Sequence, residues 1–189
     1  MTVDPSRYLF WITSRAAGTA ALVLASLAVS LGLMMGMKVL RRFRASDLRV
    51  THEVLALATL AAIAVHGLAL LGDSYVHPSV LQIVIPFDLN YRSFFTGLGV
   101  IAGYGLAFLG LGYYARRHIG AARWRRLHRF TALAWLLGLV HAIGAGSDAG
   151  SAWFLVMIGI VAVPPLTLLA WRITGGGSRP SRAVATATG

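Results

Sequence analysis

The sequence predicts an all-α membrane protein, a polytopic bundle of about five transmembrane helices. Two observations on composition support this fold class: 57% of the 189 residues are hydrophobic and only 12% are charged. A third is that the apolar residues gather in runs of about 20 residues, the length that crosses a hydrocarbon core. A chain of this size and composition cannot cover a water-soluble core with polar residues.

Five runs are long enough to span a bilayer: 12–37, 50–72, 93–115, 127–146 and 151–171. The shorter apolar segment 80–87 is β-branched and contains Pro86, which predicts a loop or an interfacial piece within the 73–92 connection. Residues 1–11 precede the first run and offer no signal-peptide cleavage site, so we expect a short extracytoplasmic N-terminus. The spans form one transmembrane domain, 12–173, and the Gly- and Ser-rich segment 174–189 predicts a disordered cytoplasmic tail.

The net charge of +11 predicts membrane topology rather than binding to nucleic acid. Fourteen of the 17 Lys and Arg residues lie in the 38–49 loop, the 116–129 loop and the C-terminal segment, between the apolar runs. Only Arg7, Arg15 and Arg92 lie on the other side. The positive-inside rule therefore places the N-terminus outside and the C-terminus in the cytoplasm, as expected for a multi-pass protein of the cell membrane.

Cysteine is absent from the chain, which narrows the possible cofactor chemistry. A disulfide framework, a thiolate metal site and a covalently attached c-type haem all require cysteine. Any haem must therefore be bound without covalent attachment.

Four of the six histidines lie within the predicted spans, where histidine is costly and usually functional. His52 and His66 are fourteen residues apart, and His128 and His141 thirteen, which corresponds to about 21 and 19.5 Å along a helix axis. Because both spans start from the cytoplasmic side, His52 lies level with His128 and His66 with His141. Two imidazoles at each of two depths suit two hexacoordinate haem irons.

The angular positions of the histidines fit one span better than the other. Fourteen residues at 100° each leave His52 and His66 about 40° apart, on one helix face. Thirteen residues leave about 140° between His128 and His141. We therefore expect a tightened turn, with Gly138 a possible position, or fraying near His128. The two remaining histidines, His77 and His118, have no partner at the same depth and are interpreted as surface residues.

Two segments carry a resemblance to a known family. THEVLALATLAAIAVHGLALLGD, residues 51–73, contains H-x13-H, and RLHRFTALAWLLGLVHAIGAGSD, residues 126–148, contains H-x12-H. With SRAAG at 14–18 and VIPF at 84–87, the chain resembles the ferric reductase-like transmembrane family. That family includes ferric reductases, NADPH oxidases and the haem-binding membrane subunit of the bacterial methionine-sulfoxide reductase system.

The resemblance implies a di-haem b-type cytochrome. It implies that two non-covalent b haems are ligated through their iron by His52, His66, His128 and His141, and that electrons pass from the cytoplasmic side to an outer acceptor. Many relatives have a sixth span and a C-terminal flavin domain, whereas this chain shows no dinucleotide fingerprint. The implied donor is therefore a separate cytoplasmic flavoprotein or membrane quinol, and the acceptor an extracytoplasmic redox protein or ferric iron. Such a subunit needs no catalytic acid, base or nucleophile.

Four arginines are candidates for contacts with haem propionates. The two histidines nearer the cytoplasmic side, His52 and His128, are flanked by three of them: Arg49, Arg126 and Arg129. These arginines could contact propionates, but the positive-inside pattern explains their positions equally well. Arg15 lies just inside the outer end of the first span, where an arginine is costly. Its expected partner is a propionate of the outer haem or an anionic substrate, unless it reaches the outer headgroups.

Other features leave alternatives open. Six glycines in the third span favour close helix packing, or room for a porphyrin edge: Gly97, Gly99, Gly103, Gly105, Gly110 and Gly112. Trp135, midway between the histidines of its span, suits packing or electron relay. A different class of function, a small metal or anion transporter using His and Arg15, would need further intramembrane carboxylates, for which Glu53 is the one candidate. A purely structural subunit would leave the histidine pattern unexplained.

Overall fold

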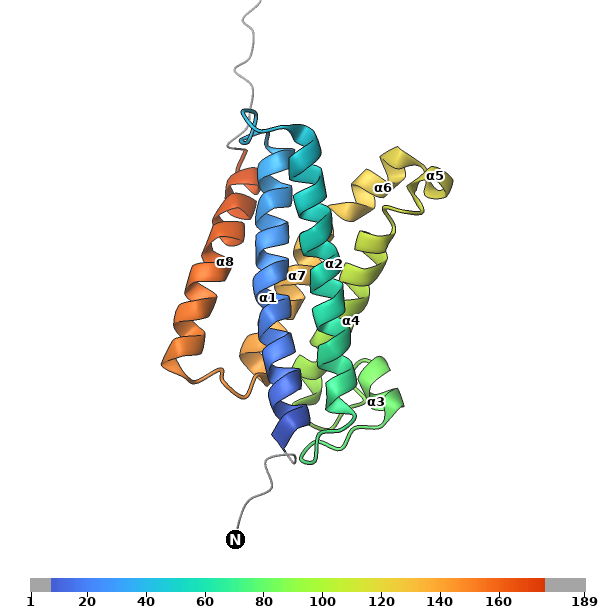
Figure 1. The fold of residues 1–189 in the computed structure, drawn as a ribbon, viewed down its shortest axis with the longest axis vertical. Helices are drawn as coiled ribbons and strands as arrows, with labels where there is room; N and C mark the ends of the chain where they lie inside the picture. Colours follow the sequence, from blue (N-terminus) through green and yellow to red (C-terminus); the bar gives the residue numbers. More distant parts are fainter. Residues whose placement is uncertain (1–7, 176–189) are drawn as a thin grey trace, which may run out of the picture.

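The structure is a computed structural model that describes residues 8–175, and it is helical, without strands, over that range (Figure 1). Five segments are long and apolar enough to cross a membrane, which confirms the predicted class of multi-pass membrane protein. The long helices are α1 Leu9–Gly36, α2 Ala45–Leu70, α4 Ser93–Leu111, α7 Thr131–Ala145 and α8 Ala152–Ile173. Three short helices lie in the connections: α3 Val80–Val84, α5 Arg116–Ile119 and α6 Ala121–His128.

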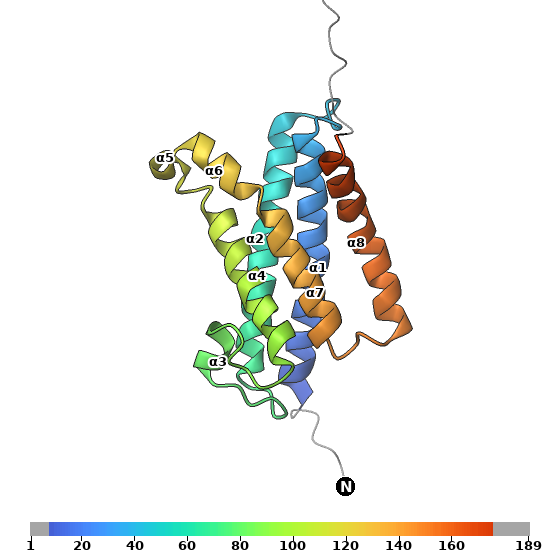
Figure 2. The ribbon, with the colours of Figure 1, turned by 180° about the vertical axis from the view of Figure 1, so that it is seen from behind.

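Helices α1, α2, α4 and α7 form a bundle, and α8 packs on the outside of α1 (Figures 1 and 2). The closest pairs are α1 with α2 and α4 with α7. Looser contacts join α1 to α7 and α2 to α4, so α2 and α7 lie diagonally across the bundle. Both α2 and α7 run from the end that carries α6 to the end that carries α3. This confirms the parallel direction predicted for the spans that contain the histidines.

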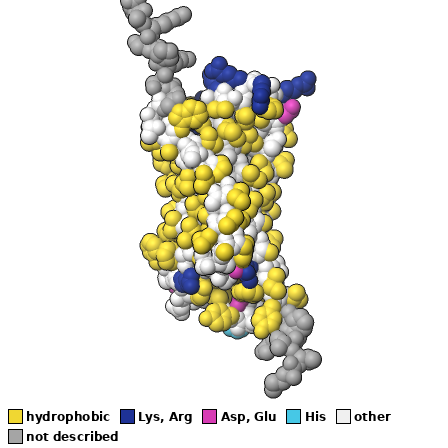
Figure 3. Space-filling view, turned by 90° about the vertical axis from the view of Figure 1, so that its left-hand side faces the viewer, with side chains coloured by type: hydrophobic (Ala, Val, Ile, Leu, Met, Phe, Trp, Pro, Cys, Tyr) yellow, Lys and Arg dark blue, Asp and Glu magenta, His cyan; other side chains and the backbone are white. Residues whose placement is uncertain are grey.

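The core lies where α1, α7 and α8 meet. It is built from buried side chains of all three helices: Leu22, Ala25, Trp135, Leu139 and Ala162. Trp135 is completely buried, and its indole N–H donates a hydrogen bond to Ser26 Oγ on α1, 3.0 Å away. Many large apolar side chains are instead exposed, and on the face that Figure 3 shows they cover the middle of the molecule. An outward apolar band is the surface that a helical bundle presents to lipid tails.

The two ends of the bundle differ in charge. The basic end carries the 37–44 connection, α5 and α6, with cations at its surface (Figure 3). The opposite end carries α3 and the connection between α7 and α8, and includes Arg15, Arg92 and Asp148. The described chain begins at the opposite end and finishes at the basic end (Figure 1). Of the terminal segments predicted at 1–11 and 174–189, residues 1–7 and 176–189 lie outside the described residues, and residues 9–11 belong to α1, which begins three residues before the predicted span.

The fourth predicted span is not a single helix. The α6 helix ends at His128 and α7 begins at Thr131, with Arg129 and Phe130 in a turn between them. Of the two alternatives predicted for this span, an interruption near His128 is confirmed, and a tightened turn at Gly138 is wrong, because Gly138 lies inside α7. The α2 helix begins at Ala45, five residues before the predicted start, and α4 ends four residues early.

The 73–92 connection contains one helical turn, α3. Ser79 Oγ accepts a hydrogen bond from the Gln82 backbone N–H, and the Gln82 side chain accepts one from the Ser79 N–H. This reciprocal capping box starts a helix with little help from packing. The interfacial piece predicted for 80–87 is thus a capped helical turn followed by a loop.

Candidate functional site: two histidine pairs between α2 and α7

The structure brings the four span histidines together in two pairs across the bundle diagonal. The ring centroids of His52 and His128 are 6.1 Å apart, and those of His66 and His141 are 6.2 Å apart. The ring planes within the pairs make angles of 83° and 70°. This confirms the predicted pairing by depth, an inner pair toward the basic end and an outer pair toward the opposite end.

A backbone carbonyl of the neighbouring helix holds each of the four rings through Nδ1. On α1, Ala28 O lies 3.0 Å from His52 Nδ1, and Ser14 O lies 2.8 Å from His66 Nδ1. On α4, the corresponding carbonyls are Leu109 O, 3.1 Å from His128, and Phe95 O, 2.9 Å from His141. A carbonyl oxygen only accepts, so Nδ1 carries the hydrogen in every ring. The lone pair of each neutral imidazole is therefore on Nε2.

The Nε2 atoms are free to bind a ligand. Among the described residues, no hydrogen bond reaches an Nε2 of these four histidines or joins the two rings of a pair. Histidines that bind metals characteristically donate the other ring N–H to a carbonyl or carboxylate, which fixes both tautomer and orientation. Both pairs have this arrangement.

The anchoring carbonyls repeat with the spacing of the histidines. Ser14 and Ala28 are fourteen residues apart on α1, as are Phe95 and Leu109 on α4. On α2 the histidines have the same fourteen-residue spacing, so antiparallel α1 and α2 keep their relative phase from one level to the next. His128 and His141 are only thirteen residues apart, and the turn between α6 and α7 changes the direction of the chain so that both rings can face the bundle.

Glycines on α1 and α4 make room for the rings. A Cβ at Gly18 would lie 3.0 Å from His66 Nδ1, and a Cβ at Gly32 would lie 3.1 Å from His52 Cε1. A Cβ at Gly99 would lie only 2.5 Å from His141 Nδ1. Gly18 and Gly32 are not among the residues predicted from the sequence to form the site. Their fourteen-residue spacing, equal to that of His52 and His66, is the signal that identifies them.

A cavity of about 810 Å³ surrounds the outer pair and extends toward α3. It lies within the size range of sites for cofactors and other small molecules. Apolar side chains and glycines provide most of its wall, together with His66 and His141. The outer histidines thus face a space that is large enough for a bulky apolar group.

Two buried polar atoms have no hydrogen-bond partner within the described residues: Asp73 Oδ2 and Trp124 Nε1. Asp73 lines the cavity, and its other oxygen accepts the N–H groups of Tyr75 and Val76 at 2.7 and 3.0 Å. Trp124 stacks on His128 of the inner pair. Unpaired buried polar groups are rare and often mark the position of a bound group.

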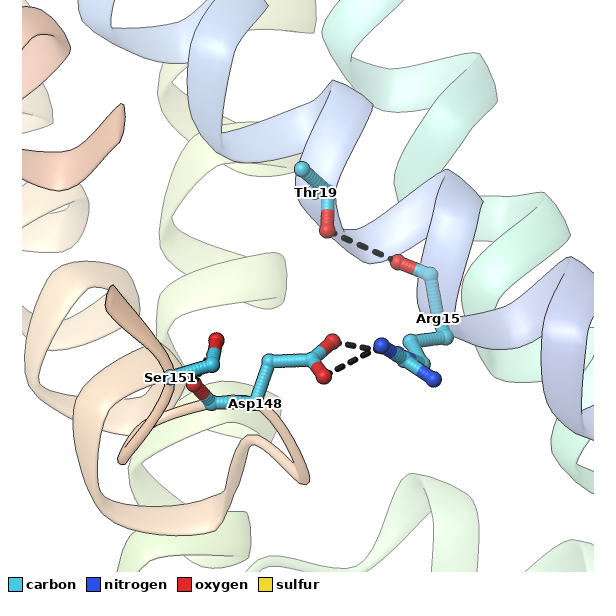
Figure 4. A network of polar contacts seen from close by, with 4 residues as sticks. All are labelled: Arg15, Thr19, Asp148 and Ser151. Atoms are coloured by element: carbon cyan, nitrogen blue, oxygen red, sulfur yellow. Dashed lines mark hydrogen bonds and ion pairs between the residues drawn. The ribbon is translucent and has the colours of Figure 1, made fainter. Parts of the chain in front are cut away.

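Arg15 lies at the rim of the cavity and is held by an acidic residue of this chain. Its Nε and Nη2 donate to the two carboxylate oxygens of Asp148, in the connection between α7 and α8 (Figure 4). The guanidinium also lies over the Trp11 ring, 4.6 Å from its centre. The partner observed for Arg15 is therefore Asp148, and its predicted contact with a propionate or an anionic substrate stays a prediction.

The other candidate arginines are exposed at the basic end. Arg126 lies on α6, Arg129 lies in the turn before α7, and Arg49 lines a small hollow together with Lys38 and Arg41. Their predicted contacts with propionates stay predictions. The histidines expected at the surface, His77 and His118, are exposed.

Glu53 has a local partner. The Tyr114 hydroxyl donates a hydrogen bond to the Glu53 carboxylate, and this bond raises the pKa of the Tyr114 phenol, which helps to keep the phenol protonated as a donor. The pair connects α2 to the end of α4.

The pairs have the dimensions of a two-nitrogen metal site. Metal–imidazole bonds of about 2.0 Å and a distance of about 1.1 Å from nitrogen to ring centre would place the centroids about 6.2 Å apart, if the metal lay midway. The observed separations are 6.1 and 6.2 Å. In the described part of the chain, no group of three or more His, Cys, Asp or Glu residues could hold a metal ion. Each pair is therefore a set of two imidazoles whose separation matches that expected for a metal held midway between them.

Comparison of the chain with protein-family models, with curated proteins and with solved structures found no match.

Proposed function

We propose that this protein is a transmembrane electron-transfer cytochrome in which His52 with His128, and His66 with His141, bind two b haems. The observation that carries the proposal is the pair of matched histidine levels, each with Nδ1 anchored and Nε2 free. Packing alone would not require the same anchor at four separate positions.

The ligand set favours haem over a bare metal ion. Two imidazoles leave the coordination of zinc, copper or iron incomplete, and no third ligand joins them among the described residues. A porphyrin brings four nitrogens of its own and needs only the two axial positions. The apolar cavity has room for a broad, flat group beside the outer pair, and Gly18 and Gly99 let the His66 and His141 rings pack against their neighbouring helices.

The residues of the two pairs and their anchors would perform two tasks. The Nδ1 anchors hold both rings of a pair so that neither imidazole has to reorient. His52 with His128, and His66 with His141, would each hold one haem iron through their Nε2 atoms, which would favour electron transfer over binding of a substrate at the metal. When bound, haem supplies one-electron redox chemistry between its ferric and ferrous states. The levels are separated by about 21 Å along α2, so they connect the two halves of the bilayer.

The donor and acceptor follow from the resemblance to the ferric reductase-like family. We infer that electrons enter at the basic end, from a cytoplasmic flavoprotein or membrane quinol, and leave at the opposite end to a redox protein or ferric iron. The concentration of cations at one end supports this orientation in the cell membrane. The chain would then be the haem-binding component of an oxidoreductase.

Histidine variants purified in detergent test the proposal through a pyridine haemochrome assay and reduced-minus-oxidised spectra. The wild type should bind two haems per chain. His66→Ala and His141→Ala should each remove one haem, and the double variant should remove no more than that one. His52→Ala combined with His66→Ala should remove both.

The exposed residues His77 and His118 provide matched controls, because their replacement by alanine should leave both haems in place. A folded wild-type preparation without haem would refute the cytochrome proposal. A different pattern, in which His66→Ala and His141→Ala together remove two haems, would refute the pairing by level.

A further inference from the structure

Trp124 is fixed beside the inner histidine pair. It precedes His128 by one helical turn on α6, and its ring stacks on that imidazole with centroids 4.8 Å apart and planes 27° apart. The Tyr113 ring packs against it edge-on, with centroids 5.5 Å apart. A Cβ added at Gly112 would lie 3.5 Å from Trp124 Cδ1, so the chain passes close to the indole there.

The indole N–H of Trp124 is buried without an acceptor in the described part of the chain. An indole nitrogen can only donate, and leaving a buried donor unpaired is energetically unfavourable. The other tryptophan of this span shows the usual solution, because Trp135 donates to Ser26 Oγ. The environment of Trp124 therefore calls for an acceptor that the surrounding side chains do not provide.

The position of Trp124 indicates the chemistry of that acceptor. Trp124 lies on the basic-end side of His128, because α6 precedes this histidine and α7 runs from it toward the opposite end. A carboxylate on a group bound between His52 and His128 would be directed toward the basic end, because an anion within the hydrocarbon is costly. A hydrogen bond from a neutral donor to a carboxylate is stronger than one between two neutral groups.

We propose that Trp124 Nε1–H donates a hydrogen bond to a propionate of the haem held by His52 and His128. This inference rests on the proposed function. Through its stack on His128 the same side chain also orients the imidazole that would ligate the iron. Trp124 would therefore bind the haem and position one of its ligands.

The proposal predicts a change in the redox potential of one haem. A propionate that accepts no hydrogen bond presents more negative charge to the iron and so stabilises the ferric form. Trp124→Phe keeps an aromatic ring against His128 but removes the donor. We expect this variant to bind two haems and to lower the midpoint potential of the inner one. The expected shift corresponds to an about threefold to tenfold change in the ratio of oxidised to reduced haem, where tenfold is about 59 mV for one electron.

Trp171→Phe is the matched control, because Trp171 lies on α8 near the basic end and is exposed. A redox titration of both variants and the wild type in detergent is the first measurement. Ultraviolet resonance Raman difference spectra, wild type minus Trp124→Phe, are the second and report whether this indole N–H is hydrogen-bonded. Where the variant does not fold, wild-type protein with haem is compared with protein from haem-deficient cells. The bonded signature should then appear only with haem.

Unchanged potentials in a Trp124→Phe protein that keeps two haems would overturn the assignment, as would a free indole N–H in the haem-loaded wild type. Equal shifts in Trp124→Phe and Trp171→Phe would also overturn it. These outcomes leave the proposed function in place, whereas a folded wild type without haem would remove its basis. The two failures are therefore distinguishable.

Discussion

Backbone atoms fix each of the four histidines, and glycines allow them to do so. A ring can approach a helix carbonyl closely only where the facing residue has no side chain in the way. Gly99 meets this requirement most strictly, because an added Cβ would lie 2.5 Å from His141 Nδ1. The helix must move or the ring must leave its anchor if that atom is added.

Gly99→Ala should therefore disrupt the outer site although alanine is the better helix former. Replacing glycine in a helix by alanine ordinarily adds about 1 kcal/mol of stability. Gly159→Ala on α8, where nothing lies within 4 Å of the added Cβ, should show that gain or no change. We expect Gly99→Ala to lose the outer haem and keep the inner one in a haemochrome assay. Two haems with wild-type spectra in this variant would contradict the account of the ring packing.

At this scale the sequence analysis could identify the histidines but not their surroundings. The distribution of Lys and Arg predicted that the second and fourth spans both start from the cytoplasmic side. This shared direction predicted that His52 pairs with His128 and His66 with His141. The Nδ1 acceptors at Ser14, Ala28, Phe95 and Leu109 are backbone atoms, which any residue type supplies. Residue type contributes at one anchor, because the Ser14 hydroxyl also lies 3.0 Å from His66 Nδ1 and donates to the His66 carbonyl. The backbone acceptors themselves leave no mark in the residue pattern. Arg15 was recognised as unusual, but its partner Asp148 lies 133 positions away, and only the fold brings the two together.

The division of the fourth span into α6 and α7 is the main feature at the scale of helices. A continuous helix would turn His128 and His141 to different faces. The turn at Arg129 and Phe130 separates the helix that presents His128 from the helix that presents His141. The sequence analysis detected this conflict from the thirteen-residue spacing. The spacing predicted either a tightened turn, with Gly138 a possible position, or fraying near His128, and the interruption lies at the second place. The spacing alone could not decide between them, because Gly138 is a good candidate by residue type and Arg129 and Phe130 are not.

The Arg15–Asp148 pair connects α1 to the connection between α7 and α8, and a double-mutant cycle measures what it contributes. Arg15 and Asp148 are 34% and 13% exposed, so solvent screening limits the interaction. For Arg15→Gln and Asp148→Asn we expect a coupling free energy of unfolding of about 0.5–1 kcal/mol. Denaturant-induced unfolding of the protein in detergent micelles provides the values.

Arg92 supplies a control cycle at the same end of the molecule. Its Nη1 donates to Gly144 O at 2.8 Å, and it makes no ion pair with Asp148 among the described residues. Arg92→Gln and Asp148→Asn should therefore be additive. Additivity in the Arg15 cycle as well would show that the ion pair does not stabilise this connection.

The whole molecule combines an apolar band, one strongly basic end and two histidine levels about 21 Å apart. Composition and run length were enough to predict the band and the number of spans, because a bilayer imposes both. The diagonal placement of α2 and α7 could not be predicted, since it depends on which helices pack most closely. That placement turns two matched depths into two facing pairs.

If the two histidine levels carry electrons across a membrane, the protein should pass electrons between the two sides of a sealed vesicle. Purified protein is reconstituted into vesicles that contain trapped ferricyanide, and dithionite is added outside. Wild-type protein should reduce the trapped ferricyanide rapidly, and with His66→Ala the reduction should be as slow as in empty vesicles. If wild-type protein with two bound haems reduced the trapped ferricyanide no faster than empty vesicles do, electron transfer through the two histidine levels would be ruled out.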